Sequence, residues 1–463
     1  MPQTYSRSRA KFSSYGDGPY DQGPYRPGGG NSMWKWIGIA GGVVAVVVVA
    51  VLLWPTLSDA LRSGGGQPSA TPAGTSLATP LPTTSVAPTS ADATQEPTVE
   101  PTSTLEPTAT PTPFVDFTIS ASGQILIESG PLAGAKTSDG EYDFAPMFDG
   151  MKDSLSKADL TLATLESTLA GKDATYSGTT KFNTPESILT AMKGAGIDFL
   201  SNAHSHIFDK GFSGVEKTIS FMSEAGLSHT GAYLSADDYH ATPMITIPDK
   251  NVKVAVLAYS EDEKFKNLIS ADKMRFAIKH INLETIKKDV KAAREAGANA
   301  VIVMLHWDNA SAKTPTSAMT TQVKKIIGYG ADLIIGSGPL YLHKIEKIKA
   351  EKEDGTETEG IVAYSLGSLV SGQQAQYKDT GAILNVSFRL DTATNMVSIT
   401  NATYVPTWVY LKDKKYTILP AGKYKESSDL LGTLSGTGQT RIKKAYDEAV
   451  AALGSTDATA VAE

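Results

Sequence analysis

The sequence contains no cysteine among its 463 residues. This absence excludes disulfide bonds, thiolate catalysis, iron–sulfur clusters and zinc fingers, because each of these needs cysteine sulfur. Any metal ion must therefore be bound by histidine, carboxylate or amide groups.

An excess of positive charge is also lacking. Lysine and arginine number 42 against 49 aspartates and glutamates, which gives a net charge of −7. This balance argues against broad contact with nucleic-acid phosphates. The glycine-rich stretches do not have the spacing of a dinucleotide or P-loop site, so no nucleotide cofactor is predicted. Hydrophobic residues make up 41% of the chain, which is enough for a buried core.

Charge is nearly absent from residues 34–54, which read WKWIGIAGGVVAVVVVAVLLW with Lys35 as the only interruption. About 20 apolar residues match the thickness of a bilayer core, and tryptophan at both ends suits the two interfaces. A buried core helix or a cleaved signal peptide is the alternative, and both fit these features less well. Basic residues precede this segment and only Arg62 follows it closely, so we expect a single-pass membrane helix with a cytoplasmic N-terminus and the rest of the chain extracellular.

The regions on either side of this helix have low-complexity composition. Residues 1–33 read as a disordered cytoplasmic tail, and residues 55–113 as a Pro/Thr/Ser-rich extracellular linker. Ten of the 24 prolines lie in residues 64–113. An exported, tethered and cysteine-free protein is typical of Gram-positive bacteria. We expect one domain over 114–411, a C-terminal extension with a terminal helix over 412–453, and a disordered tail over 454–463.

From Phe114 onward, short apolar runs alternate with helical periodicity, which predicts an α/β fold with parallel strands. The predicted strands are 116–120, 160–165, 198–201, 243–247, 252–259, 300–305, 332–335, 361–366 and 382–390. The predicted helices are 185–195, 213–225, 282–296 and 316–329, and a terminal helix is expected around 440–452.

Polar residues gather where these strands end, which is where ligands bind in such sheets. They are Glu166, His204, His206, His306 and Ser337. A single histidine at a strand end is more often a hydrogen-bonded structural residue than a ligand. Three histidines and a carboxylate at successive strand ends instead predict a functional site.

Several segments together resemble one family. They include ADLTLATLESTLAG at 158–171, KFNTPESILTAMKGAGIDFLSNAHSHIFDKG at 181–211, AREAGANAVIVMLHW at 293–307 and YSLGSLVSGQ at 364–373. In this order they resemble the CapA family of poly-γ-glutamate capsule biosynthesis proteins, which has a calcineurin-like metallophosphatase fold. The likeness covers about residues 117–411. It implies a metallophosphatase-like β-sandwich of two stacked sheets flanked by helices, with a two-metal site.

The residues depart from the family's metal-binding pattern at several positions. Gln124 stands where the pattern has an aspartate, Ser205 where it has an asparagine, and Ser368 where it has another asparagine. The Gly-His-His-Pro-His element is replaced by residues 336–340, which read GSGPL and lack all three histidines. A two-metal centre needs a bridging carboxylate and several further ligands, so such a centre is not expected here.

The retained residues allow a smaller site. At most one divalent metal is expected, with Glu166, His204 and His306 as ligands, or with His206 in place of His204. His206 and Glu166 are the candidate catalytic residues. The candidate ligand-binding residues are Lys181, Asn183, Ser205, Lys210 and Ser337. The two lysines could bind an anionic polymer, although two solvated lysines are an equally good interpretation.

The resemblance implies a membrane-anchored extracellular protein that helps to make, export or retain poly-γ-glutamate or another anionic surface polymer. Expected partners are the membrane, the polymer, and a polyglutamate synthase or export membrane proteins, with no nucleic acid. One alternative is a hydrolase or transferase, with or without a metal, acting on an envelope polymer. The other is a cell-wall scaffold without a role in the capsule.

Overall fold

The computed structural model describes residues 113–261, 268–454 and 457–462. The predicted cytoplasmic tail, the predicted membrane helix at 34–54 and the linker up to residue 112 lie outside these residues. Within the described ranges, no helix combines the length and the apolar character that a membrane crossing requires.

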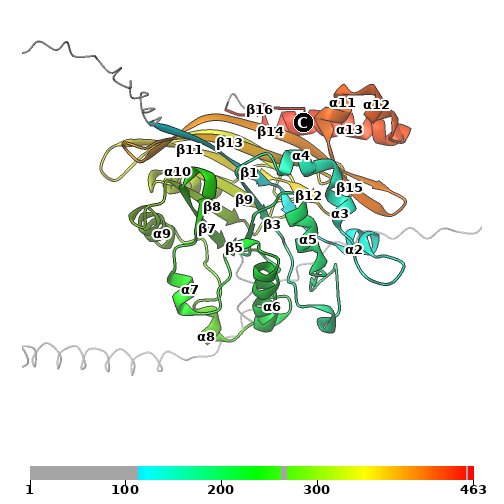
Figure 1. The fold of residues 1–463 in the computed structure, drawn as a ribbon, viewed down its shortest axis with the longest axis horizontal. Helices are drawn as coiled ribbons and strands as arrows, with labels where there is room; N and C mark the ends of the chain where they lie inside the picture. The colour runs from blue at the N-terminus through cyan, green and yellow to red at the C-terminus, as the bar shows by residue number, and fades with distance from the viewer. Residues whose placement is uncertain (1–112, 262–267, 455–456, 463) are drawn as a thin grey trace, which may run out of the picture. The chain divides into compact units, whose positions relative to one another are not determined.

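The larger sheet has eight strands (Figure 1). Along its main path the order is β15-β14-β13-β1-β3-β4-β5, and β16 pairs with β14. β1, β3, β4 and β5 run parallel, whereas β13 pairs with β1 in the antiparallel sense. The bounds are β1 (Phe114–Ser122), β3 (Leu160–Thr164), β4 (Phe199–Ser201), β5 (Ser228–Thr230), β13 (Thr380–Asp391), β14 (Met396–Lys412), β15 (Lys415–Pro420) and β16 (Thr459–Ala460).

The second sheet has six strands in the order β10-β11-β9-β8-β7-β6. Its four central strands are parallel, and the two edge strands are antiparallel to their neighbours. The bounds are β6 (Met244–Ile247), β7 (Val252–Ser260), β8 (Ala300–His306), β9 (Leu333–Ser337), β10 (Leu342–Glu351) and β11 (Glu357–Leu366). A short pair, β2 (Gln124–Ile125) and β12 (Ser368–Val370), forms a separate two-stranded sheet.

The two sheets share one apolar core, to which Ile119, Leu162, Val256, Ile302 and Leu384 contribute. Helices cover the outer faces. Side chains of α3 (Ala145–Phe148) and α5 (Ser187–Gly194) pack on the eight-stranded sheet, and those of α9 (Leu283–Glu295) and α10 (Ser317–Gly328) pack on the six-stranded sheet. Every residue of β8 is buried, which explains why this strand reads as a continuous apolar run. The predicted mixed α/β fold with two sheets and helices outside is confirmed.

The remaining α-helices of the described residues are short, except for α6 with 14 residues and α13 with 18. They are α2 (Ser129–Ala135), α4 (Lys152–Leu155), α6 (Gly211–Glu224), α7 (Ala236–His240), α8 (Ala271–Met274), α11 (Ala421–Glu426), α12 (Ser428–Gly432) and α13 (Gly436–Leu453). The four helices predicted before the C-terminal region correspond to α5, α6, α9 and α10. Asn282 and Thr316 cap α9 and α10, since their side chains accept hydrogen bonds from backbone N–H groups of the first turn.

The C-terminal region corrects the sequence interpretation. β15 continues the eight-stranded sheet, so residues from 412 onward are not merely an extension beside the domain. The tail predicted to be disordered over 454–463 contains β16, in which Thr459 pairs with Thr403 and Ala460 with Tyr404. β15 pairs only with the far end of β14, which leaves these two positions open. A strand of two residues has no periodicity by which the sequence could reveal it.

Candidate functional site

The candidate site lies where the carboxyl ends of parallel strands from both sheets meet. Glu166 follows β3, Ser205 and His206 follow β4, and His306 ends β8. These side chains line one cleft of about 390 Å³, together with Lys181. The topology thus brings together most of the polar residues that the sequence predicted at strand ends.

His306 is the centre of this arrangement and is only 2% exposed. Its Nε2 atom lies 2.9 Å from the Ser205 hydroxyl and 3.5 Å from Oε1 of Glu166. Its Nδ1 atom lies 3.0 Å from the hydroxyl of Ser337, at the end of β9. Each ring nitrogen of His306 is therefore hydrogen-bonded to a serine hydroxyl. Coordination of a metal by either nitrogen would require that hydrogen bond to be broken.

His206 belongs to a second polar group on the same cleft. Its Nδ1 atom lies 2.7 Å from Oδ2 of Asp209, which also accepts the backbone N–H of Phe182 at 2.7 Å. A carboxylate at Nδ1 fixes the ring orientation and favours the tautomer that can accept a proton at Nε2. The sequence analysis did not identify Asp209 as a site residue. Its position three residues after His206 could have indicated it, because residues with this spacing can contact each other within one turn.

His204 does not line the cleft as the predicted ligand set requires. Its side chain is fully buried, its Nδ1 atom accepts the backbone N–H of His206 at 3.2 Å, and its ring centre lies 6.5 Å from that of His306. Burial, followed by the nearby His306 and His206, holds the pKa of His204 well below its usual range. His204 is therefore a neutral, buried imidazole that packs beneath the residues of the cleft.

The predicted ligand-binding residues divide into two groups. Lys181 lines the cleft, and Ser205 and Ser337 hold His306. Asn183 is fully buried, and its amide accepts from Ala170 N–H and donates to the carbonyls of Gly171 and Thr175.

Backbone groups thus engage the Asn183 amide, which holds a loop in place. The ammonium group of Lys210 donates to the Ala174 carbonyl at 3.1 Å, so it too is engaged with this loop.

Gln124 occupies a buried position beneath the cleft, with 1% of its surface exposed. Its Oε1 atom accepts the backbone N–H of Gly338 at 2.8 Å. Gly338 has a φ of +102°, and an added Cβ would lie 2.1 Å from the carbonyl oxygen of Trp307. The amide of Gln124 thus fixes the turn after β9, which stands where the family pattern has its three histidines.

A family model described as bacterial capsule synthesis protein PGA_cap matches residues 118–373, which include both halves of the cleft. The chain belongs to this family. The predicted relationship to CapA is confirmed by two curated relatives, both from Bacillus.

The capsule biosynthesis protein CapA of Bacillus anthracis is 28% identical over 192 residues, covering 41% of this chain and 43% of that protein. The PGA biosynthesis protein CapA of Bacillus subtilis is 27% identical over 183 residues, covering 39% and 44%. The matches thus span less than half the length of these relatives.

Two solved structures are similar at a low level. NAD nucleotidase of Haemophilus influenzae has a TM-score of 0.37 and 12% identity, covering 76% of this chain and 58% of that one. A phosphatase from Mycoplasma pneumoniae has a TM-score of 0.36 and 12% identity, covering 63% and 94%. Scores this low have no bearing on the function of the PGA_cap chain.

The PGA_cap cleft does not fit a two-metal centre. In the described part of the chain, no group of three or more His, Asp or Glu residues is placed to hold a metal ion. The imidazole of His306 is held by two hydroxyls, and Gln124 uses its oxygen on a backbone N–H. The cleft offers instead a histidine–aspartate pair, the carboxylates of Glu166 and Asp308, and one lysine.

A substitution at Gln124 tests this description of the cleft floor. Gln124→Glu should lower the free energy of unfolding by about 2 kcal/mol at neutral pH, because a buried carboxylate without a cation replaces a neutral amide. The loss should shrink in acid, since burial raises the pKa of such a carboxyl group. Urea unfolding at pH 7 and pH 5 measures both effects.

Gln374→Glu is the matched control, because Gln374 is exposed. If Gln124→Glu were as stable as the control and were further stabilised by added Mn²⁺ or Zn²⁺, the cleft floor would be a cation site after all.

Proposed function

We propose that this chain takes part in producing or retaining an anionic capsule polymer, poly-γ-glutamate, and that its cleft contributes binding and positioning without a two-metal hydrolytic centre. The observation that carries this proposal is the match of a capsule-synthesis family to residues 118–373. The names of the two Bacillus relatives point to the same process.

The cleft chemistry supports a degenerate metal site. Ser205 and Ser337 present hydroxyls to His306, and a hydroxyl is a weaker metal ligand than the amide or imidazole of the family pattern. Lys181 places one positive charge at a cleft that Glu166, Asp209 and Asp308 also line, so it offers a single contact point for a carboxylate of the polymer.

The location of the chain is part of the same proposal and rests on the sequence alone. Residues 34–54 would anchor the protein in the cell membrane, the linker would carry the domain on the outer side, and a polyglutamate synthase or export membrane proteins would be its partners.

The contact between His206 and Asp209 favours a second candidate, a metal-independent hydrolase or transferase acting on an envelope polymer. The pair has the geometry of an oriented general base, and Glu166 lines the same cleft. In this case the imidazole would remove a proton from an attacking hydroxyl, amine or water.

Deletion of the gene and complementation distinguish these candidates. We expect deletion to reduce surface poly-γ-glutamate and the unaltered gene to restore it. In the binding proposal, His206→Ala also restores the polymer and its chain-length distribution, measured by electrophoresis of the extracted capsule. In the enzyme proposal, His206→Ala behaves like the deletion.

His240→Ala, which changes an exposed histidine, controls for expression and handling, and immunoblotting confirms equal protein levels. Unchanged polymer after deletion would refute a capsule role and favour a cell-wall scaffold.

A further inference from the structure

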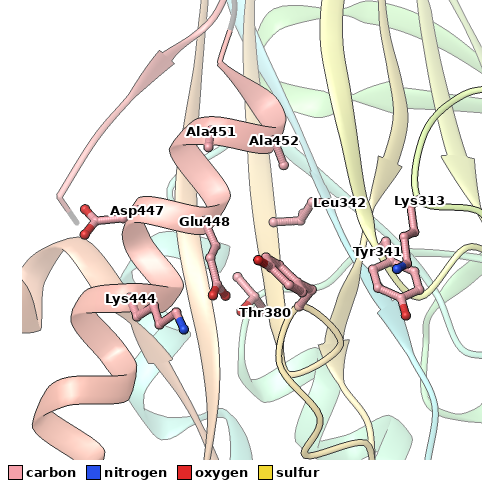
Figure 2. A pocket seen from close by; sticks show the side chains of 10 residues that line it. Lys313, Tyr341, Leu342, Thr380, Lys444, Asp447, Glu448, Ala451 and Ala452 are labelled. Carbon is pink, nitrogen blue, oxygen red and sulfur yellow. The ribbon is translucent and has the colours of Figure 1, made fainter.

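A second groove, of about 670 Å³, lies away from the strand-end cleft, against the C-terminal helix (Figure 2). One wall is a single face of α13, which presents Lys444, Glu448 and Ala452. Lys313 and Tyr341 form the opposite wall, and Thr380 lies between the walls. This volume is within the range of about 300–1,000 Å³ that is typical of ligand sites.

The groove is composite. Lys313 and Tyr341 belong to the segment that matches the family model, whereas Tyr377, Thr380 and all of α13 follow residue 373, where that match ends. The groove therefore depends on how this chain continues after the family segment.

The acids of the groove are engaged with other residues. Asp447 lines the groove and pairs with Lys425 at 2.6 Å. Glu448 pairs with Arg441 at 2.9 Å.

The lysines are not neutralised in this way. In the described ranges, no ion pair involves Lys313, Lys378 or Lys444, which are all at the groove or at its rim. Lys313 and Lys378 lie 5.8 Å and 5.6 Å from the ring centre of Tyr341, within the range of cation–π attraction. The groove therefore keeps a local excess of positive charge.

Apolar surface lies between these charges. Tyr377 is 51% exposed, and its φ of 73° is a backbone conformation that an aromatic residue rarely adopts. The next residues hold it there, because the buried carboxylate of Asp379 accepts hydrogen bonds from Arg441 of α13 and from Trp408. The same network ties the Tyr377 loop to α13, so this loop and the α13 wall are held together before a ligand binds.

We infer that this groove binds an extended, amphipathic polyanion whose carboxylates recur along a chain with short apolar spacers. γ-Linked polyglutamate has this chemistry, because each repeat carries one carboxylate, one amide and two methylene groups. The lysines match the carboxylates, and the tyrosine rings match the methylene segments. The choice of polyglutamate rests on the proposed function, whereas the preference for a polyanion rests on the groove residues. A neutral glycan would use the rings but not the lysines.

The test is equilibrium binding of fluorescently labelled poly-γ-glutamate to the full chain purified in detergent, followed by anisotropy at several salt concentrations. The double variant Lys313→Glu/Lys444→Glu should raise the dissociation constant about tenfold or more and reduce its salt dependence. Tyr377→Ser should weaken binding by about threefold to tenfold with its salt dependence retained. Lys288→Glu, on an exposed position of α9, is the matched control and should bind as the unaltered chain does.

A chemical footprint of the unaltered chain tests the same inference without relying on the folding of variants. Acetylation of lysine amines, read by mass spectrometry, should be slowed by the polymer at Lys313, Lys378 and Lys444 and unchanged at Lys288. Equal affinity of all variants, no protection of these three lysines, or no binding by the unaltered chain would overturn the inference. Protection by neutral cell-wall glycan strands but not by polyglutamate would overturn it in favour of glycan binding. These outcomes are separate from the gene deletion, which tests the role in the capsule whichever groove holds the polymer.

Discussion

Replacing Asp379 with alanine should lower the free energy of unfolding by about 3–5 kcal/mol, which is the cost of removing one partner of a buried ion pair. The Asp379 side chain is 4% exposed and that of Arg441 20%. The carboxylate accepts two hydrogen bonds from the guanidinium of Arg441 and one from Nε1 of Trp408 at 2.8 Å. The substitution would leave an arginine at a largely buried position with only Glu448 as its acidic partner.

Asp116→Ala is the matched control for this prediction. Asp116 also accepts two hydrogen bonds from one arginine, Arg389, at 2.7 and 2.8 Å, but 62% of its side chain is exposed. Solvent screens such pairs, so its removal should cost far less. Urea unfolding followed by circular dichroism compares the two variants. Equal losses would show that the Asp379 network does not hold the C-terminal helix to the sheet.

Acid should destabilise the domain, with His204 as one main contributor. The pKa of His204 is held well below its usual range in the folded protein by burial and by the neighbouring His306 and His206. In the unfolded chain it returns to about 6.5. The stability that neutral His204 allows is therefore complete above about pH 6.5 and is lost as pH falls, by up to about 1.4 kcal/mol per pH unit.

His204→Asn should remove this part of the pH dependence. The shorter amide can still accept the backbone N–H that Nδ1 accepts, but it does not titrate. Between pH 7 and pH 5, the variant should lose about 2 kcal/mol less than the unaltered protein in urea unfolding. Comparison at pH 8 gives the cost of the substitution itself, independent of protonation. An unchanged pH slope would show that His204 is not a source of acid sensitivity.

Much of the fold could be predicted because buried parallel strands leave a strong signal. β7, β8 and β9 read as apolar runs, and α9 and α10 carry both periodicity and capping residues. β5 left no such signal because its three residues, Ser228–Thr230, are polar, and β16 left none because it has only two residues. Each is placed by the strand with which it pairs, β5 by β4 and β16 by β14.

The site was partly predictable for a related reason. Strand ends of parallel sheets converge, so Glu166, His206 and His306 were brought together as expected. Sequence alone could not tell that the amide of Asn183 is used up by backbone groups, because that depends on how one loop folds back. The groove along α13 escaped prediction altogether, since its walls come from segments that lie far apart in the chain.

The position of β1 has a mechanical consequence. β1 is the first strand of the described domain, and the chain enters it directly from Pro113, whose carbonyl accepts the backbone N–H of Thr392. All nine residues of β1 pair with β13, and β3 pairs with the other side of β1. Because ladder hydrogen bonds run perpendicular to the strands, a pull on the N-terminal end along the strand axis loads them in shear, and they resist together instead of unzipping one by one.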